Sequence, residues 1–176
     1  ALAQLQLLTA KPMLYVANVE EASVATGNAY SARIAARAAS EGAACVIVSA
    51  AIEAEIATLS DAEERRAFQD TLGLAETGLA RVIRAGYELL DQITFFTAGP
   101  KEARAWTVRR GSKAAQAAGA IHSDFERGFI RAETIAYDDF VACGGEQGAK
   151  DAGRMRVEGR DYAVKDGDIV ILRFKV

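Results

Sequence analysis

The first half of the chain alternates short apolar runs with amphipathic segments. Apolar runs at Met13–Ala17 and Cys45–Val48 predict two buried strands, because each is too short for a buried helix. Residues 26–41 between them predict a helix that ends at Gly42. Its apolar stripe consists of Tyr30, Ile34 and Ala38. A strand, a helix and a second strand within about 30 residues predict parallel strands joined by a right-handed crossover.

Further helical patterns follow the second strand. Residues 52–59 predict one helix, and Ser60-Asp61-Ala62-Glu63 has the spacing of a capping box that begins another. A third helix is indicated by apolar residues at helical spacing, namely Leu79, Val82, Ile83, Tyr87 and Leu90. The chain also opens within a helical pattern, formed by Leu2, Leu5 and Leu8. We therefore expect the sequence to be a piece of a longer protein.

The pattern changes near Gln92, where shorter strands and more turns begin. Strands are predicted at Ile93–Thr97, Ala103–Val108, Gly128–Tyr137 and Ile169–Phe174, with turns at Gly99-Pro100 and Asp166-Gly167-Asp168. Short helices are predicted at Lys113–Ala118 and between Gly144 and Gly153, and a hairpin at Arg156–Gly159 with Tyr162–Val164. The sequence therefore predicts an α/β domain with a parallel sheet in residues 1–91, followed by a small α+β domain in residues 92–176.

Charge separates the same two segments. The net charge is −3, but residues 1–91 carry 7 Lys and Arg against 12 Asp and Glu, whereas residues 92–176 carry 14 against 12. The two cysteines form no disulfide framework, and Cys45, within an apolar run, predicts a buried thiol in a reducing compartment. No apolar stretch approaches the roughly 18 residues of a membrane span, so we expect no membrane association.

The turn Asn18-Val19-Glu20-Glu21, directly after the first strand, is a candidate site for a nucleotide base. In G domains the last acid of an Asn-Lys-x-Asp turn accepts two hydrogen bonds from guanine. Here Val19 replaces the lysine and the longer Glu21 replaces the aspartate, and both changes argue against tight guanine recognition. The same pattern also fits a strand-end turn in which an asparagine side chain bonds to its own backbone.

Ser49 and Ala50 follow the second strand and strengthen the first interpretation. A Ser-Ala pair at this strand end offers backbone groups to the base in G domains, and ligands of α/β sheets bind at the carboxyl ends of strands. Ser49 also fits an ordinary helix N-cap. We therefore predict that Asn18, Val19, Glu21, Ser49 and Ala50 form a base-binding site.

Catalytic machinery is absent from the sequence. None of the 15 glycines is followed by lysine, so the chain has no phosphate loop. The single D-x-x-G tract, Asp70-Thr71-Leu72-Gly73, fits a helix end capped by Gly73 better than a magnesium site. His122 is the only histidine. We predict neither catalytic residues nor a metal site.

Basic residues of the second segment are candidates for contact with RNA or the ribosome. They are Arg109, Arg110, Lys113, Arg127 and Arg131. Solvated charges that protect strand edges are the alternative.

Several longer tracts resemble the Obg-like ATPases of the YchF type over essentially the whole chain. The most specific is Ile121-His122-Ser123-Asp124-Phe125-Glu126-Arg127-Gly128-Phe129-Ile130-Arg131-Ala132-Glu133. Others are Phe95-Phe96-Thr97-Ala98-Gly99-Pro100-Lys101-Glu102, Ala105-Trp106-Thr107-Val108-Arg109-Arg110-Gly111 and Glu158-Gly159-Arg160-Asp161-Tyr162.

The resemblance implies a cytosolic, ribosome-associated P-loop ATPase that prefers ATP to GTP and uses Mg²⁺. Residues 1–91 would then be the C-terminal part of its G domain, and residues 92–176 a TGS domain, a ubiquitin-like β-grasp module. Because phosphate loop and magnesium ligands are missing, we expect no ATP hydrolysis by this chain alone. We expect the longer protein to be monomeric, and this chain to self-associate through the bare edge of its parallel sheet. The remaining alternative is an RNA- or protein-interaction module without a nucleotide-dependent function.

Overall fold

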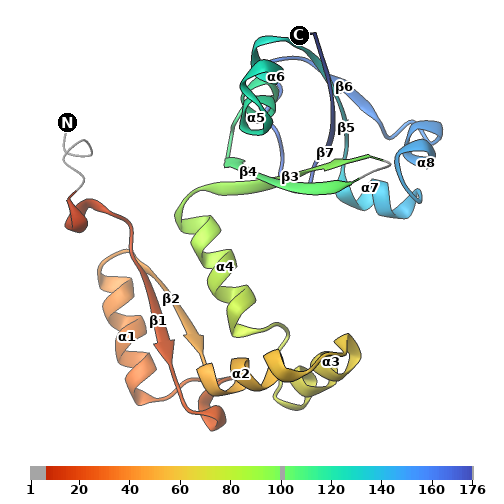
Figure 1. Ribbon diagram of the computed structural model, residues 1–176. Coiled ribbons are helices and arrows are strands. Elements are labelled where there is room, and N and C mark those ends of the chain that lie inside the picture. Colours follow the sequence, from red (N-terminus) through yellow and green to blue (C-terminus); the bar gives the residue numbers. More distant parts are fainter. Residues whose placement is uncertain (1–6, 100–101, 176) are drawn as a thin grey trace. The chain divides into compact units, whose positions relative to one another are not determined.

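The computed structural model describes residues 7–99 and 102–175 (Figure 1). The chain divides into two compact units, Ala1–Leu90 and Asp91–Val176. The helix expected around Leu2 and Leu5 lies outside the described residues, and Leu8 falls in a short 3₁₀ turn, η2 (Leu8–Ala10).

The first unit contains a two-stranded parallel sheet. Strands β1 (Leu14–Asn18) and β2 (Ala44–Val48) pair in register from Leu14 opposite Ala44 to Asn18 opposite Val48, which confirms the predicted parallel pairing. The helices are η3 (Glu21–Ser23), α1 (Ala29–Ser40), α2 (Ala50–Thr58), α3 (Ala62–Thr71) and α4 (Gly78–Leu89). Helices α1 and α4 both contact the two strands.

Side-chain caps set where these helices begin. Helix α1 starts at Ala29, three residues later than predicted, because the Asn28 side chain accepts hydrogen bonds from the N–H groups of Tyr30 and Ser31. Helix α3 begins after Asp61, whose carboxylate accepts from the N–H of Glu63, so the capping residue is not Ser60. Gly73 has a φ of +67° after α3, as predicted for a helix-ending glycine.

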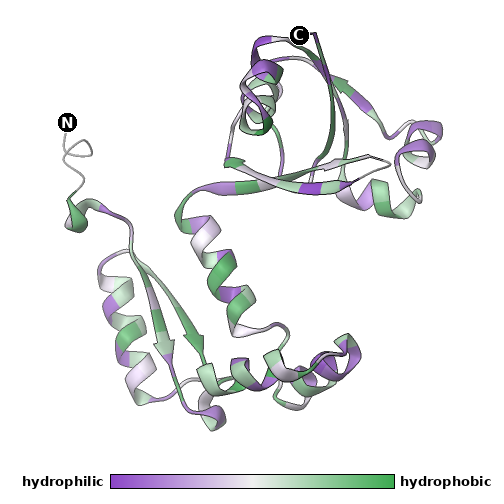
Figure 2. Cartoon of the chain, in the orientation of Figure 1, coloured by the Kyte–Doolittle hydropathy of each residue, from purple (hydrophilic) through white to green (hydrophobic). Residues whose placement is uncertain are grey.

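The strands of the first unit are less buried than predicted. Ala17 is buried, but Val16 is 47% exposed and Cys45 is only half-buried, so the prediction of a buried thiol is wrong. Tyr30, expected on the buried stripe of α1, is 74% exposed. The reason is that only two strands pair here among the described residues, although both are strongly apolar (Figure 2). The buried cluster lies instead beside the sheet, at Val24, Ile52, Ile56 and Leu74.

The second unit is built on a five-stranded mixed sheet with the order β4-β3-β7-β5-β6. The strands are β3 (Gln92–Ala98), β4 (Ala103–Arg109), β5 (Phe129–Ile135), β6 (Arg156–Glu158) and β7 (Ile169–Phe174). Strand β3 pairs antiparallel with β4 and parallel with β7, and β5 pairs antiparallel with both β7 and β6. The last strand of the chain therefore lies at the centre of the sheet.

Helices cover both faces of this sheet. Helix α5 (Ala114–Ile121) buries four alanines against Ile93 and Phe95, and α6 (Ser123–Arg127) follows it with Phe125 at the border of the same cluster. Helices α7 (Tyr137–Ala142) and α8 (Glu146–Asp151) pack near Ile135 and Ile169, in a second cluster. Residues 93 and 95 face one cluster and Phe96 the other, as the alternation of a strand requires.

The predicted hairpin of Arg156–Gly159 with Tyr162–Val164 is wrong. Strand β6 pairs with β5, and Tyr162 and Val164 instead bond to the segment at the start of α5. Ala114 N–H donates to the carbonyl of Tyr162 at 2.8 Å, and Val164 N–H donates to that of Ser112 at 3.0 Å. Helices α6 and α7 were not predicted, and the strand expected to reach Tyr137 ends at Ile135 because Tyr137 begins α7. The expected turn at Pro100 lies outside the described residues.

Candidate functional sites

The structure brings together the two strand-end loops of the first unit. The side-chain Oδ1 of Asn18, at the end of β1, accepts a hydrogen bond from the N–H of Ala50 at 2.9 Å. The N–H of Val19 donates to the carbonyl of Val48 at 2.8 Å. Because both loops leave the carboxyl ends of parallel strands, Asn18, Val19, Ser49 and Ala50 lie at one edge of the sheet.

The Asn18–Ala50 bond fixes the orientation of the asparagine amide. Only the amide oxygen can accept from the N–H of Ala50, so the Nδ2 group is the end of the side chain that does not take part in this bond. Within the described part of the chain, Nδ2 has no hydrogen-bond partner, and Asn18 is exposed. The strand-end interpretation, in which the side chain bonds only to its own turn, is therefore wrong. Asn18 can present an N–H donor to a ring nitrogen or carbonyl of a base.

Ser49 has a buried hydroxyl that lacks a partner. The residue is 1% exposed and occupies the N-cap position of α2, yet its Oγ makes no hydrogen bond to the helix or to any other described group. Buried hydroxyls are normally hydrogen-bonded. Ser49 therefore occupies the N-cap position that was considered for it, but its side chain does not cap the helix.

The two acids of the turn differ in their surroundings. Glu20 accepts hydrogen bonds from the Ser23 hydroxyl at 2.5 Å and from the Asn28 amide at 2.8 Å, and the Ser23 bond in particular lowers the pKa of Glu20. Glu21 is exposed, and its side chain has no hydrogen-bond or ion-pair partner among the described residues. Val19 is buried, with 8% exposure. Glu21 is consequently the carboxylate of this turn that is available to a ligand.

The five basic candidates of the second unit belong to five different segments of the chain. They lie on β4, in the turn after it, at the start of α5, at the end of α6 and on β5. Four are ion-paired, namely Arg110 with Asp91, Lys113 with Asp161, Arg127 with Asp124 and Arg131 with Glu133. Arg109 has no ion pair among the described residues. Acidic side chains therefore offset the charge at four of the five positions.

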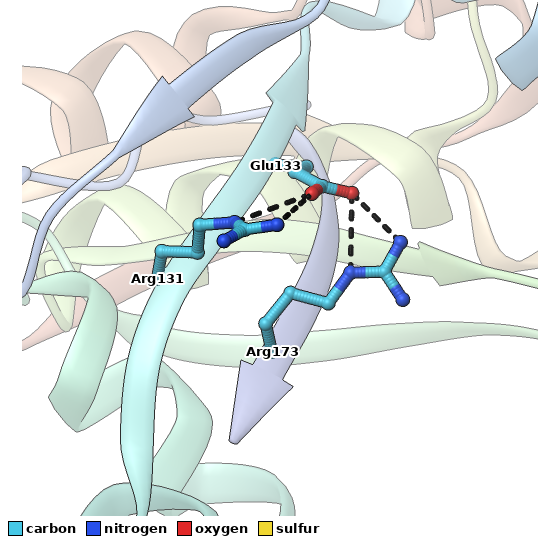
Figure 3. Close-up of polar contacts among 3 residues, drawn as sticks. All are labelled: Arg131, Glu133 and Arg173. Atoms are coloured by element: carbon cyan, nitrogen blue, oxygen red, sulfur yellow. Dashed lines mark hydrogen bonds and ion pairs between the residues drawn. The ribbon is translucent and has the colours of Figure 1, made fainter.

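One cluster on the sheet was missed by the sequence analysis. Glu133 of β5 accepts hydrogen bonds from Arg131 on its own strand and from Arg173 of β7 (Figure 3). The shortest contacts are 3.2 Å from Arg131 Nη2 and 2.8 Å from Arg173 Nη2. These bonds, that from Arg173 first, hold the pKa of Glu133 below its ordinary value. The sequence signal was a single arginine in the otherwise apolar strand Ile169–Phe174.

His122 acts as a helix cap. Its Nδ1 accepts a hydrogen bond from the N–H of Asp124 at 3.2 Å at the start of α6, and its ring lies 5.7 Å from that of Phe125. No group of three or more His, Cys, Asp or Glu residues in the described ranges could hold a metal ion. In the same ranges, no helix combines the length and apolar character needed to cross a membrane.

Comparison with known proteins gives consistent matches for this two-unit α/β chain. Residues 92–175 match the YchF-GTPase_C family, described as a protein of unknown function (DUF933). The chain is 55% identical over 175 residues to the ribosome-binding ATPase YchF of Bacillus subtilis, which covers 98% of this chain and 48% of that protein. It is 44% identical over 171 residues to Obg-like ATPase 1 of Rattus norvegicus, and the match covers 96% of this chain and 43% of that protein.

A solved structure agrees with these relatives. The YchF GTPase of Schizosaccharomyces pombe matches with a TM-score of 0.83 and 34% identity, covering 98% of this chain and 46% of that one. The chain therefore belongs to the YchF family. It spans about half the length of the curated relatives that it matches.

Proposed function

We propose that this chain is the base-reading and ribosome-binding part of a YchF-type ATPase. Residues 1–91 form the C-terminal part of the nucleotide-binding domain, and residues 92–176 form a TGS domain. The parent protein is cytoplasmic, binds ATP with Mg²⁺ and associates with the ribosome. The relatives named ribosome-binding ATPase YchF and Obg-like ATPase 1 support the association with the ribosome and the ATPase activity.

The hydrogen bond between Asn18 and Ala50 carries the proposal for the first unit. It joins the two loops at the place where α/β domains bind ligands, and leaves the Asn18 amide N–H and the Glu21 carboxylate free. Adenine offers an amine donor to Glu21 and a ring acceptor to Asn18. The adjoining loop also carries the buried Ser49 hydroxyl, which has no hydrogen-bond partner among the described groups.

Nucleotide selectivity tests this site. In a longer form that carries a phosphate loop, we expect tighter binding of ATP than of GTP. The double variant Val19→Lys with Glu21→Asp restores the pattern of guanine-binding turns and shifts the preference toward GTP. Ala22→Ser, an exposed change in the same turn, serves as the matched control. If the ratio of ATP affinity to GTP affinity is the same in the parent form and in the double variant, this turn does not determine nucleotide selectivity.

The strand order of the second unit supports the TGS assignment. In a β-grasp fold the first and last strands lie side by side and parallel at the centre of the sheet, as β3 and β7 do here. Cosedimentation with ribosomal subunits tests the proposed role. The variant with Arg109, Arg110 and Arg131 all changed to Glu should lose cosedimentation. Unchanged cosedimentation would favour the alternative, a module whose charges are only solvated.

A further inference from the structure

Arg131 and Arg173 lie directly opposite each other on antiparallel strands β5 and β7. Like charges in directly opposed positions destabilise a sheet. Glu133 lies between the two guanidinium groups and offers one carboxylate oxygen to each (Figure 3). One carboxylate balances only one of the two positive charges, so this cluster of three side chains carries a net charge of about +1.

The two guanidinium groups keep unused donors. Each arginine bonds to Glu133 through its Nε and Nη2, and neither Nη1 has a partner among the described groups. The side chains of Arg131 and Arg173 are 50% and 51% exposed, whereas that of Glu133 is 13% exposed. The largely buried carboxylate therefore holds two exposed guanidinium groups in a fixed orientation.

The surrounding sheet face is open. Helices α7 and α8 cover the Ile135–Ile169 end of this face, whereas Val157, which pairs with Glu133 across β5 and β6, is 67% exposed. Glu146, at the start of α8, is a second acid whose charge acts on Arg173. The two arginines and the neighbouring aliphatic side chain lie on one exposed sheet face, along which an extended chain can bind.

We infer that Arg131 and Arg173, oriented by Glu133, bind adjacent phosphates of an RNA backbone, with Val157 against the sugar. This inference rests on the proposed association with the ribosome and names the surface responsible. Arginine forks match phosphate oxygens in geometry and charge. An acidic protein segment would bind to the same two arginines, but a surface for such a segment would not contribute to the binding of free RNA. The experiment below therefore distinguishes the two ligands.

Binding of a fluorescent single-stranded RNA of mixed sequence to the 176-residue chain tests the inference. The variant Arg131→Gln with Arg173→Gln should bind about tenfold more weakly, and the slope of log K against log[salt] should fall by about 1.4, the value for two phosphate contacts. Glu146→Gln should bind more tightly, because it removes a negative charge near Arg173 without removing a hydrogen bond that orients either arginine. The matched control is Arg104→Gln with Arg154→Gln, which removes two exposed, ion-paired arginines of the same unit.

The outcomes separate this inference from the proposed function. Loss of RNA binding in the Arg131/Arg173 variant alone, with an unchanged circular dichroism spectrum, supports it. Equal loss in both double variants, or no loss in either, overturns it. If the variant keeps RNA binding but loses ribosome cosedimentation, the surface binds protein and the RNA assignment is wrong. If the unchanged chain binds free RNA through these arginines but does not cosediment with ribosomal subunits, the proposed ribosome association is wrong, whereas the assignment of this surface to RNA binding stands.

Discussion

The carboxylate of Glu53 accepts a hydrogen bond from the backbone N–H of Gly78 at 2.7 Å. It also accepts from the N–H of Leu79 at 3.1 Å, so that a side chain of α2 satisfies two of the free donors at the start of α4. A negative charge at this end of a helix is favourable as well. Glu53 therefore joins the element that follows the Ser49 loop to the helix that packs on β1 and β2.

Replacement of Glu53 should destabilise the first unit. Glu53→Ala removes both bonds and leaves two helix-terminal donors unpaired, at a cost of about 1–2 kcal/mol in the free energy of unfolding. Urea denaturation followed by circular dichroism measures the effect. Glu55→Ala is the matched control, because Glu55 is an exposed acid of the same helix without such a side-chain bond. Equal losses in both variants would show that the Glu53 bonds contribute nothing.

Local sequence patterns predicted which helices and strands form more successfully than they predicted what packs against each of them. Parallel pairing of β1 with β2 and the last strand Ile169–Phe174 followed from apolar runs. The hairpin predicted at Tyr162 does not form, because this backbone bonds to the segment at the start of α5, about 50 residues away along the chain, and no local pattern contains that information. The exposure of Val16 and Tyr30 was missed because an apolar run shows that a segment can be buried, not what covers it.

Asn18 should matter for nucleotide binding more than for stability. Asn18→Ala removes the bond to Ala50 and the free amide donor, and we expect about a tenfold weaker ATP affinity in a longer form with a phosphate loop. Isothermal titration calorimetry measures the affinity. Asp61→Ala is the control, because it removes the cap of α3 and costs about 1 kcal/mol without touching either base loop. An Asn18 variant that binds ATP normally would remove this residue from the site.

The site was predicted unevenly for a physical reason. Asn18 and Ala50 could be placed together from sequence, because parallel strands end at the same edge of a sheet. That Glu20 is engaged by Ser23 and Asn28 while Glu21 is free could not be predicted, since it depends on the direction of two adjacent side chains. The Glu133 cluster was missed because the register of β5 against β7 joins residues 40 positions apart.

Stability of the second unit should fall in acid because of Glu133. Hydrogen bonds from Arg173 and then Arg131 lower the pKa of this carboxyl below 4.5, against an opposing effect of burial. The folded state therefore binds fewer protons than the unfolded state as pH falls below 4.5. The stabilisation is fully present above that pH and is lost as pH falls through the lowered, folded-state pKa.

The single tryptophan provides the measurement, because Trp106 lies in β4 of this unit. Urea denaturation followed by its fluorescence should show a steep loss of stability below pH 4.5 in the unchanged chain. The loss should be shallower in Glu133→Gln, which cannot change charge. Glu102→Gln, at an exposed pair next to β4, should leave the pH profile unchanged. Parallel profiles for the unchanged chain and Glu133→Gln would contradict the assignment.

Gly128, directly before β5, has a packing role. A Cβ atom at this position would lie 1.9 Å from the backbone carbonyl oxygen of Lys175. The two backbones are also hydrogen-bonded, since the N–H of Lys175 donates to the carbonyl of Gly128 at 2.9 Å. Backbone cannot move aside as a flexible side chain can. The glycine therefore permits the close approach of the start of β5 to the end of β7.

We expect Gly128→Ala to lower the free energy of unfolding of the second unit by about 1–3 kcal/mol, through overpacking against fixed backbone. Trp106 fluorescence in urea measures the loss. Gly159→Ala is the matched control, because nothing lies within 4 Å of its added Cβ and its φ is not positive, so its stability should change by less than about 0.5 kcal/mol. An equally stable Gly128→Ala variant would show that β7 can shift outward. In that case the register that places Arg173 opposite Arg131 would be loosely held.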